Sequence, residues 1–383
     1  MYFLGGYLVR IAISTLIDYF NYGNRLQNYA LQEVLKKMGN EVYTIKDYTD
    51  LVGKRSIRVR VLNSIKKGHI LNRFVKKVKR IGKNTNNTLN EVRKNNFINF
   101  TNKYIKETDF YINQNTTDFS FENNFDCFVI GSDQVWNYMF QTSFLFSFVE
   151  YTKKPKISYA ASFGVNSIPK NYLASYKKGL NSVDIISVRE NEGKKIVDQL
   201  SNKSATVVLD PTLLLTMDEW KKVIDGKKKY KEKYVLTYFL DNPDKNTMQY
   251  INSFVRDRNF VIKNLYSDKY PELWTADPAE FVNLISQAEA IFTDSFHGCV
   301  FSIIFQRYFE VFDRNNNGPS MNSRIDTLFN ELDLMDRWHR NDIRKTIDYS
   351  KVEDKLKNKR NESLNFLKES LENVKNMEKI DLK

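Results

Sequence analysis

The sequence of 383 residues predicts an α/β protein with two domains, each built around a parallel sheet. The chain is too long for one ordinary hydrophobic core. Residues 9–45 have the pattern of a strand, a loop, a helix ended by Gly-Asn and a second strand, which is a βαβ unit. A second α/β series starts at residue 234, after a charged stretch at 221–233 that we interpret as the inter-domain connection. The domains are expected at residues 1–215 and 216–345, followed by a charged helix at 346–383.

The first domain opens with this βαβ unit. Residues 9–15 are rich in β-branched side chains, which favour strands. Apolar side chains then recur every 3.6 residues over 25–38, which predicts an amphipathic helix. The polar, Asn-rich run 84–96 is interpreted as a loop. Further strands are expected at 41–45, 125–130, 156–161, 184–188 and 205–209, and further helices at 97–105, 172–180 and 191–200.

The second domain repeats the alternation of strands and helices. Its clearest helix start is Asp277-Pro278-Ala279-Glu280, because proline is favoured in the first turn of a helix. That helix is expected to end near Gln287. Strands are expected at 234–239, 260–265, 289–292 and 308–312, and further helices at 245–256 and 352–377.

The net charge of +13 is concentrated in one segment. Twelve Lys and Arg and no acidic residue fall between Lys54 and Lys83, so the rest of the chain carries only +13 − 12 = +1. Apolar residues interleave with these charges, which predicts a basic amphipathic insertion at about 52–83. Two interpretations stay open: a solvated insertion packed by its apolar side, or attachment to anionic lipid at roughly 1 kcal/mol per basic residue. Nucleic acid is not favoured, because no binding motif accompanies the charge.

The sequence predicts a cytoplasmic protein, and the membrane-attached alternative for residues 54–83 would place it at the inner face of the membrane. No run approaches the roughly 20 apolar residues of a membrane span. The first 20 residues contain Arg10 and Asp18 and lack a small-residue cleavage site, so they fit a first strand better than a signal peptide. Cys127 and Cys299 both lie in apolar runs and are expected to be reduced core residues.

Polar clusters follow the predicted strands. In open α/β sheets ligands bind beyond the carboxyl ends of strands, so these clusters indicate where a site forms. No Gly-rich dinucleotide or Walker motif, no GxSxG and no zinc-type Cys/His spacing occurs. The clusters are Asn21–Asn24, Gly131–Asn137, Ala161–Gly164, Arg189-Glu190 and Asp294–Gly298.

His297 stands between a predicted strand and a predicted helix. It is one of three histidines, and Gly298 after it allows close approach of a ligand or of another backbone. The N-terminus of the following helix presents free N–H groups and suits an anion. The alternative is a histidine that only caps or packs this turn.

Three further charged residues are candidates. Arg189 at a strand end suits a bidentate carboxylate or phosphate clamp, or else pairs with Glu190 or Glu192. Asp133 is a base, an acceptor for a sugar hydroxyl, or a cap for the turn that follows it. Arg324 lies beyond the Gly/Asn-rich loop 315–318, a candidate lid.

Several motifs together resemble the polysaccharide pyruvyl transferase family. They occur in the family's order over about residues 9–335. Each motif is weak alone, but the ordered set is specific. The motifs are Asn21-Tyr22-Gly23-Asn24-Arg25-Leu26-Gln27-Asn28-Tyr29-Ala30-Leu31, Gly131-Ser132-Asp133-Gln134-Val135-Trp136-Asn137, Tyr159-Ala160-Ala161-Ser162-Phe163-Gly164, Ser187-Val188-Arg189-Glu190, Asp210-Pro211-Thr212, Thr293-Asp294-Ser295-Phe296-His297-Gly298 and Asn322-Ser323-Arg324-Ile325.

The resemblance implies two Rossmann-like domains facing a cleft, similar to GT-B glycosyltransferases. It implies transfer of a pyruvyl group from phosphoenolpyruvate to two hydroxyls of a surface-polysaccharide sugar, forming a cyclic ketal. His297 is then the candidate general acid, Arg189 the donor clamp, and Asp133 the acceptor of a proton or hydroxyl. Other substrate contacts are expected from Asn21, Asn24, Gln134, Ser162, Ser295, Gly298 and Arg324.

One position departs from the family pattern. Some members carry arginine where this sequence has Ser295, so Arg314, Arg324 or helix-terminal amides are expected to hold phosphate instead. The expected partners are phosphoenolpyruvate and a sugar acceptor, either free or lipid-linked, with no metal and no other cofactor. A glycosyltransferase using a nucleotide sugar, and a non-catalytic membrane-associated assembly factor, are the alternatives.

Overall fold

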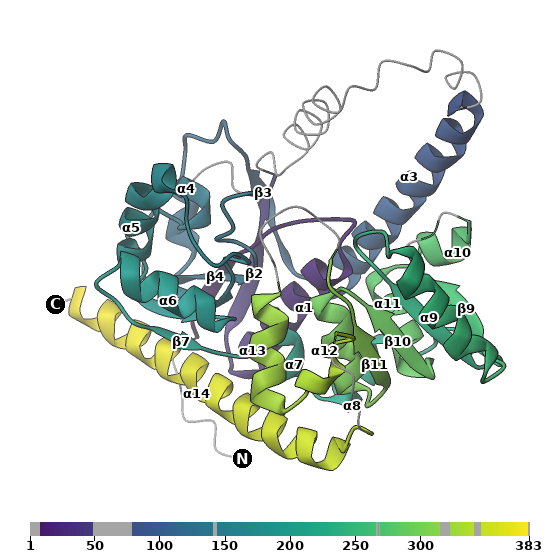
Figure 1. Ribbon diagram of the computed structural model, residues 1–383. Helices are drawn as coiled ribbons and strands as arrows, with labels where there is room; N and C mark the ends of the chain where they lie inside the picture. The colour runs from purple at the N-terminus through teal and green to yellow at the C-terminus, as the bar shows by residue number, and fades with distance from the viewer. Residues whose placement is uncertain are drawn as a thin grey trace.

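The computed structural model describes residues 8–48, 79–140, 144–265, 267, 269–314, 322–340 and 346–381. Two parallel sheets form its frame (Figure 1). The first has the strand order β3-β2-β1-β4-β5-β6-β7, and the second has the order β11-β10-β8-β9. The predicted α/β class with two Rossmann-like units is confirmed.

The elements alternate along the chain as parallel sheets require. The strands are β1 Arg10–Ser14, β2 Glu41–Asp47, β3 Glu107–Ile112, β4 Cys127–Asp133, β5 Lys156–Ala161, β6 Ile185–Val188, β7 Ala205–Val207, β8 Tyr234–Tyr238, β9 Val261–Asn264, β10 Ala290–Thr293 and β11 Tyr308–Val311. The helices are α1 Tyr22–Lys37, α3 Lys79–Tyr104, α4 Phe144–Ser147, α5 Leu173–Ser182, α6 Asn191–Leu200, α7 Pro211–Leu214, α8 Met217–Val223, α9 Lys245–Arg256, α10 Pro271–Trp274, α11 Pro278–Gln287, α12 Phe296–Ile304, α13 Ser323–Leu332 and α14 Tyr349–Asp381.

Each sheet reverses its strand order at one point. In the first sheet β1 pairs on one side with β2 and on the other with β4, with Ile11 opposite both Val42 and Cys127. In the second sheet β8 lies between β9 and β10. All seven residues of β4 are buried, as expected for a central parallel strand covered on both faces. Loops that leave a sheet at such a reversal diverge and leave room for a ligand.

The two units share one hydrophobic core. Tyr22 of α1 stacks on Phe281 of α11, with ring centroids 4.7 Å apart. Arg93 of α3, fully covered, donates to the carbonyl oxygen of Phe20 at 3.0 Å and to that of Trp274 at 2.5 Å. Aromatic packing and a buried guanidinium thus hold α1 and α3 against the second unit.

The terminal helix α14 contacts both units. Its N-terminal part lies against the second unit, where the Tyr349 hydroxyl donates to the Ser302 carbonyl oxygen at 3.4 Å. Further along, Arg360 Nε donates to the Leu213 carbonyl oxygen at 2.8 Å, and the Leu209 N–H donates to Ser363 Oγ at 3.0 Å. The helix therefore runs beneath both units, as the yellow ribbon in Figure 1 shows.

Some predicted elements differ from the structure. The loop predicted at 84–96 is wrong, because this run belongs to α3. Arg93 and Asn96 are held there by the backbone of residues 274 and 275, so tertiary contacts override the weak helix propensity of asparagine. The helix predicted from residue 25 begins at Tyr22, since Asn21 Oδ1 caps it by accepting from the Asn24 N–H at 3.2 Å.

Some observed elements were not predicted, and some predicted segments lie outside the described residues. Strand β3 and helix α13 have no counterpart in the sequence-based prediction, and α8 occupies the start of the charged connection at 221–233. Most of the basic insertion at 52–83 and the loop at 315–318 lie outside the described residues. The domain boundaries at 215 and 345 stay predictions. Over the described part of the chain, no helix is long and apolar enough to cross a membrane.

Candidate active site

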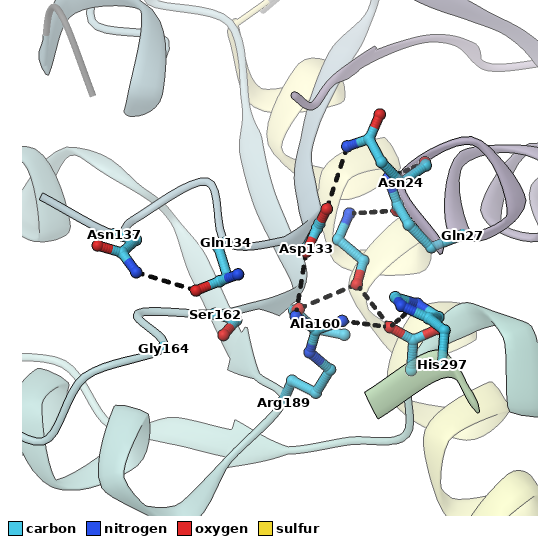
Figure 2. A network of polar contacts seen from close by, with 12 residues as sticks. Asn24, Gln27, Asp133, Gln134, Asn137, Ala160, Ser162, Gly164, Arg189 and His297 are labelled. Atoms are coloured by element: carbon cyan, nitrogen blue, oxygen red, sulfur yellow. Dashed lines mark hydrogen bonds and ion pairs between the residues drawn. The ribbon is translucent and has the colours of Figure 1, made fainter. Parts of the chain in front are cut away.

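The carboxyl ends of the two sheets meet at a buried polar cluster (Figure 2). His297 is the second residue of α12, directly after β10, and Asp210 caps α7, after β7. The Nε2 atom of His297 lies 3.7 Å from Oδ2 of Asp210. Gly23 of α1 makes this approach possible, because a Cβ built there would overlap the imidazole ring. The histidine of the second unit is therefore fitted against helix α1 and the loop after β7 of the first.

Arg189 lies between two carboxylates of the first unit. It follows β6, and its NH1 atom donates to Asp210 Oδ2 at 2.6 Å while NH2 reaches Asp133 Oδ1 at 3.4 Å. The alternative pairing of Arg189 with Glu190 or Glu192 is wrong. Glu190 instead accepts hydrogen bonds from Ser162 Oγ and from the backbone N–H groups of residues 163 and 164.

Asp133 ends β4 at the reversal point of the first sheet. Its φ of 67° is in the left-handed region, which is uncommon for a residue other than glycine. Asn24 Nδ2 donates to Asp133 Oδ2 at 3.1 Å, opposite the contact with Arg189. The carboxylate therefore faces α1 and β6. The interpretation of Asp133 as a cap for the turn that follows it is wrong, because both oxygens face these other elements.

A second layer of hydrogen bonds fixes the cluster. Ser132 Oγ donates to Asp210 Oδ2 at 3.3 Å, and the Ser132 N–H donates to Gln27 Oε1 at 3.1 Å. Gln27 Nε2 in turn donates to Thr15 Oγ1 at 3.1 Å. These residues are buried, so each exchanges solvent contacts for fixed partners and holds the backbone beside Asp133 in place.

The cluster keeps its charges in spite of burial. Burial alone would raise the pKa of Asp210, but the neighbouring His297 and the Arg189 cation hold this pKa well below its usual range. Burial likewise opposes ionisation of Asp133, yet Arg189, His297 and the Asn24 amide lower the pKa of its carboxyl group. Burial would lower the pKa of Arg189, which Asp210 and Asp133 raise above its ordinary value. Both carboxylates and the guanidinium are therefore charged at neutral pH.

Arg324 of α13 adds a buried cation to this region. Its guanidinium carbon lies 5.8 Å from the ring centre of Phe296, and that of Arg189 lies 4.8 Å from the same ring. Burial and the positive charges of Arg189 and Arg314 lower the pKa of Arg324 to about 9. The Nε atoms of Arg189 and Arg324 and the Nε2 atom of His297 are buried without a hydrogen-bond partner among the described residues. Unpaired buried donors of this kind suit an anionic ligand.

The turn before α12 uses its polar groups locally. Ser295 Oγ accepts from the Gly298 N–H at 3.4 Å, as a helix cap. A Cβ on Gly298 would lie 2.6 Å from Thr293 Oγ1, so glycine allows α12 to pack closely on β10. The Asp294 carboxylate accepts from the backbone N–H groups of residues 240 and 241 and so joins the loops after β8 and β10.

The structure brings together four of the predicted site residues, Asn24, Asp133, Arg189 and His297. Arg324 joins them through Phe296. Gln134 lies apart and accepts from Asn137 Nδ2 at 2.9 Å, as the left side of Figure 2 shows. The Asn21 amide oxygen is used as a helix cap and the Ser162 hydroxyl is bonded to Glu190. A substrate-binding role for each of these residues stays a prediction.

Sequence reasoning overlooked Asp210, Ser132, Gln27 and Gly23 as parts of the site. Asp210-Pro211-Thr212 follows a predicted strand, so a signal was present, but the motif is also an ordinary helix start: Asp210 Oδ1 accepts from the Thr212 N–H at 3.0 Å. The helix-cap role uses the Oδ1 atom of Asp210, whereas the role in the site uses Oδ2, which faces Arg189 and His297. Within the described ranges no group of three or more His, Cys, Asp or Glu is placed to hold a metal ion.

Several solved structures are similar to this one at low sequence identity. The UDP-GlcNAc 2-epimerase from Neisseria meningitidis bound to UDP-GlcNAc is 10% identical, with a TM-score of 0.48 over 94% of this chain and 99% of that chain. The UDP-GlcNAc 2-epimerase from Methanocaldococcus jannaschii is 11% identical, with a TM-score of 0.48 over 91% and 92%. The UDP-N-acetylglucosamine 2-epimerase from Rickettsia bellii is 11% identical, with a TM-score of 0.43 over 97% and 98%.

No curated protein matches the chain significantly. A family model described as polysaccharide pyruvyl transferase matches residues 21–316. This range is well over half of the 383 residues and contains every residue of the His297–Asp210–Arg189–Asp133 cluster. The chain therefore belongs to the polysaccharide pyruvyl transferase family.

Proposed function

We propose that this protein transfers a pyruvyl group from phosphoenolpyruvate to two hydroxyls of one sugar in a surface polysaccharide or its precursor. The observation that carries the proposal is the buried cluster in which a histidine and two arginines have unpaired nitrogen donors. Phosphoenolpyruvate carries a carboxylate and a phosphate, and guanidinium groups bind both. Arg189 of the first unit and Arg324 of the second unit would hold these two anionic groups.

The proposed chemistry begins with proton transfer. His297 as an imidazolium donates a proton to the enol carbon C3, which becomes the methyl group, and C2 becomes an oxocarbenium-like electrophile. One sugar oxygen forms a bond to C2; the bond from C2 to the phosphate oxygen then breaks, and a second sugar oxygen takes its place. Of the two hydroxyl protons, one replaces the proton lost by the imidazole and the other leaves with phosphate. The products are a cyclic ketal and inorganic phosphate.

The carboxylates have different roles in this scheme. The lowered pKa of Asp133 makes it a weak base, so we assign it to orient a sugar hydroxyl and to stabilise positive charge at C2. Asp210 lies against His297, with 3.7 Å between its Oδ2 atom and Nε2 of the imidazole, and orients the ring toward the donor. Asp210 is thus a positioning residue.

Changing Arg324 to methionine should separate binding from stability. The charged side chain is repelled by Arg189 and Arg314, so its removal should leave the melting temperature of the ligand-free protein unchanged or raise it. Loss of a charged hydrogen bond to the donor should weaken phosphoenolpyruvate binding at least about tenfold. Calorimetric titration with phosphoenolpyruvate measures the affinity.

Arg340→Met is the matched control for this substitution. Arg340 is partly exposed and pairs with Asp313 and Asp326, away from the cluster, so affinity should not change. The proposal fails if the intact protein neither binds phosphoenolpyruvate nor releases phosphate from it with any sugar acceptor. A melting-temperature increase with UDP or CMP sugars alone would point instead to a nucleotide-sugar glycosyltransferase.

We also propose that the basic segment 54–83 recruits the protein to anionic membrane, where lipid-linked sugars are found. Its twelve positive charges should give binding to vesicles containing phosphatidylglycerol that weakens as salt rises. Co-sedimentation measures this binding. Replacing the twelve basic residues with glutamine should remove it; equal sedimentation of parent and variant would contradict the proposal.

A further inference from the structure

Three tyrosines form a row along the carboxyl edge of the first sheet. Tyr19 follows β1, Tyr48 follows β2, and Tyr111 is the last residue but one of β3. The ring centres of Tyr48 and Tyr111 are 5.8 Å apart. Burial, the negative charge of Glu107 and the nearby Tyr48 raise the pKa of Tyr19 above its ordinary value, so Tyr19 and Tyr48 are neighbours. Tyr48 is 45% exposed and Tyr111 is 61% exposed, while Tyr19 is half-buried.

The row leads to the catalytic cluster. Since the strand order is β3-β2-β1-β4, Tyr111, Tyr48 and Asp133 mark the ends of β3, β2 and β4, and Tyr19 lies in the loop that follows β1, the strand between β2 and β4. The Arg25 guanidinium lies 5.9 Å from the Tyr19 ring and its Nε donates to Asn24 Oδ1 at 3.1 Å. The Asn24 amide then donates to Asp133. With about 4.8 Å between neighbouring strands, the row extends roughly 10–15 Å from the site.

Exposed aromatic rings at the carboxyl edge of the first sheet indicate a ligand-binding surface. Two neighbouring, largely exposed tyrosines leave apolar ring surface in water at the sheet edge where ligands bind. A tyrosine ring offers an apolar face and a polar hydroxyl, which suits a partner with the same mixture. A pyranose ring is such a partner, because its C–H groups form an apolar face and its hydroxyls form the rim.

We propose that Tyr19, Tyr48 and Tyr111 bind successive sugar rings of the acceptor next to the ring that is modified. The acceptor is then an oligosaccharide or a longer chain, since a monosaccharide at Asp133 would not reach Tyr111. This inference rests on the proposed function. A lipid chain fits the row less well, because each ring carries a hydroxyl and the exposed Asp109 and half-buried Lys46 lie on the same strands.

The inference is tested by direct sugar binding, which does not depend on turnover. The probes are lacto-N-tetraose, cellotetraose and maltotetraose, with galactose, glucose and N-acetylglucosamine as the matching monosaccharides. Titrations followed by NMR shifts or tyrosine fluorescence give their affinities. The variants are Tyr48→Ala/Tyr111→Ala and Tyr48→Phe/Tyr111→Phe, and Tyr270→Ala, at an exposed tyrosine of the second unit, is the control.

The intact protein should bind at least one tetrasaccharide about tenfold more tightly than any monosaccharide. The double alanine variant should lose about five- to tenfold of that affinity, while the double phenylalanine variant keeps most of it because the ring faces remain. Tyr270→Ala should behave as the parent. Since every pyranose has a C–H face, failure of all three tetrasaccharides to bind better than the monosaccharides overturns the inference, as does unchanged binding by the alanine variant.

Two other results are distinguishable from these. Tetrasaccharide binding that depends on the tyrosines, together with no phosphoenolpyruvate binding, would leave the row as a sugar platform and reject the proposed donor. Binding of neutral phosphatidylcholine vesicles that is lost in the alanine variant, without sugar binding, would assign the row to a membrane and overturn the inference.

Discussion

Replacement of His297 with asparagine is expected to lower kcat for phosphoenolpyruvate-dependent phosphate release by about 10²–10⁴-fold, the usual contribution of a general acid. Asparagine retains a hydrogen-bonding amide near Asp210, but it cannot donate a proton to carbon. Phosphoenolpyruvate affinity should change much less, because Arg189 and Arg324 stay in place. Phosphate release with an acceptor gives the rate, and calorimetry gives the affinity.

His339→Asn provides the matched control for that experiment. His339 lies outside the cluster, where its Nδ1 atom is 3.0 Å from Glu310 Oε2 and its ring stacks on Phe312. Its replacement should leave kcat within about twofold of the parent if the protein remains folded, which the melting temperature reports. A His297→Asn protein with normal turnover would show that proton donation comes from another group.

Asp210→Asn should be strongly destabilising. Asparagine caps a helix about as well as aspartate, so the start of α7 survives and the substitution removes mainly the charge. Among the described residues, Arg189 then keeps only Asp133, at 3.4 Å, as a charged partner within salt-bridge distance. Leaving a buried guanidinium without its closest carboxylate should cost about 3–5 kcal/mol in the free energy of unfolding, measured by urea titration. Asp218→Asn, at an exposed pair with Lys221, should cost less than about 1 kcal/mol.

The same substitution should change the acid sensitivity of the fold. The pKa of Asp210 and that of Asp133 are lower in the folded protein than the ordinary value of 3.8, so the folded state binds fewer protons than the unfolded chain. This stabilisation is complete above about pH 4 to 5 and is lost as the pH falls toward the folded pKa values. Asp210→Asn should therefore lose less stability than the parent between pH 5 and pH 3. Parallel stability curves over that range would contradict the assigned pKa direction.

Helices and strands could be predicted from the sequence where the residues that determine them lie within the same short segment. Helix α9 starts and ends at the predicted residues 245 and 256, because its apolar face and its Asp244 cap lie within the segment itself. Helix α3 was missed at 84–96 because its Arg93 and Asn96 side chains donate to backbone carbonyl oxygens at the end of α10, about 180 residues away in the chain. Strand β3 is the end strand of the described sheet, next to β2, and carries both exposed and buried side chains, a weak signal in sequence.

The candidate site was accessible only in part for a related reason. Polar residues at strand ends identified His297, Arg189, Asp133 and Asn24, since every parallel strand delivers its end to the same edge. The sequence did not reveal which carboxylate pairs with Arg189. Glu190 adjoins Arg189 in sequence, yet Asp210 is the carboxylate at 2.6 Å because the loop after β7 returns toward β6. Such pairings depend on strand order, which spacing along the chain does not reveal.

Helix α14 has a consequence for how substrates enter. It is one continuous helix of 33 residues, about 50 Å long, bound near its start to the second unit and near its middle to the first. A helix attached to both units resists their relative motion, because a large rotation of one unit against the other must bend the helix or detach one of its ends. The gap between His297 and Asp210 is thereby kept nearly constant. Donor and acceptor should then reach the cluster by movements of loops and side chains rather than by closure of two swinging halves.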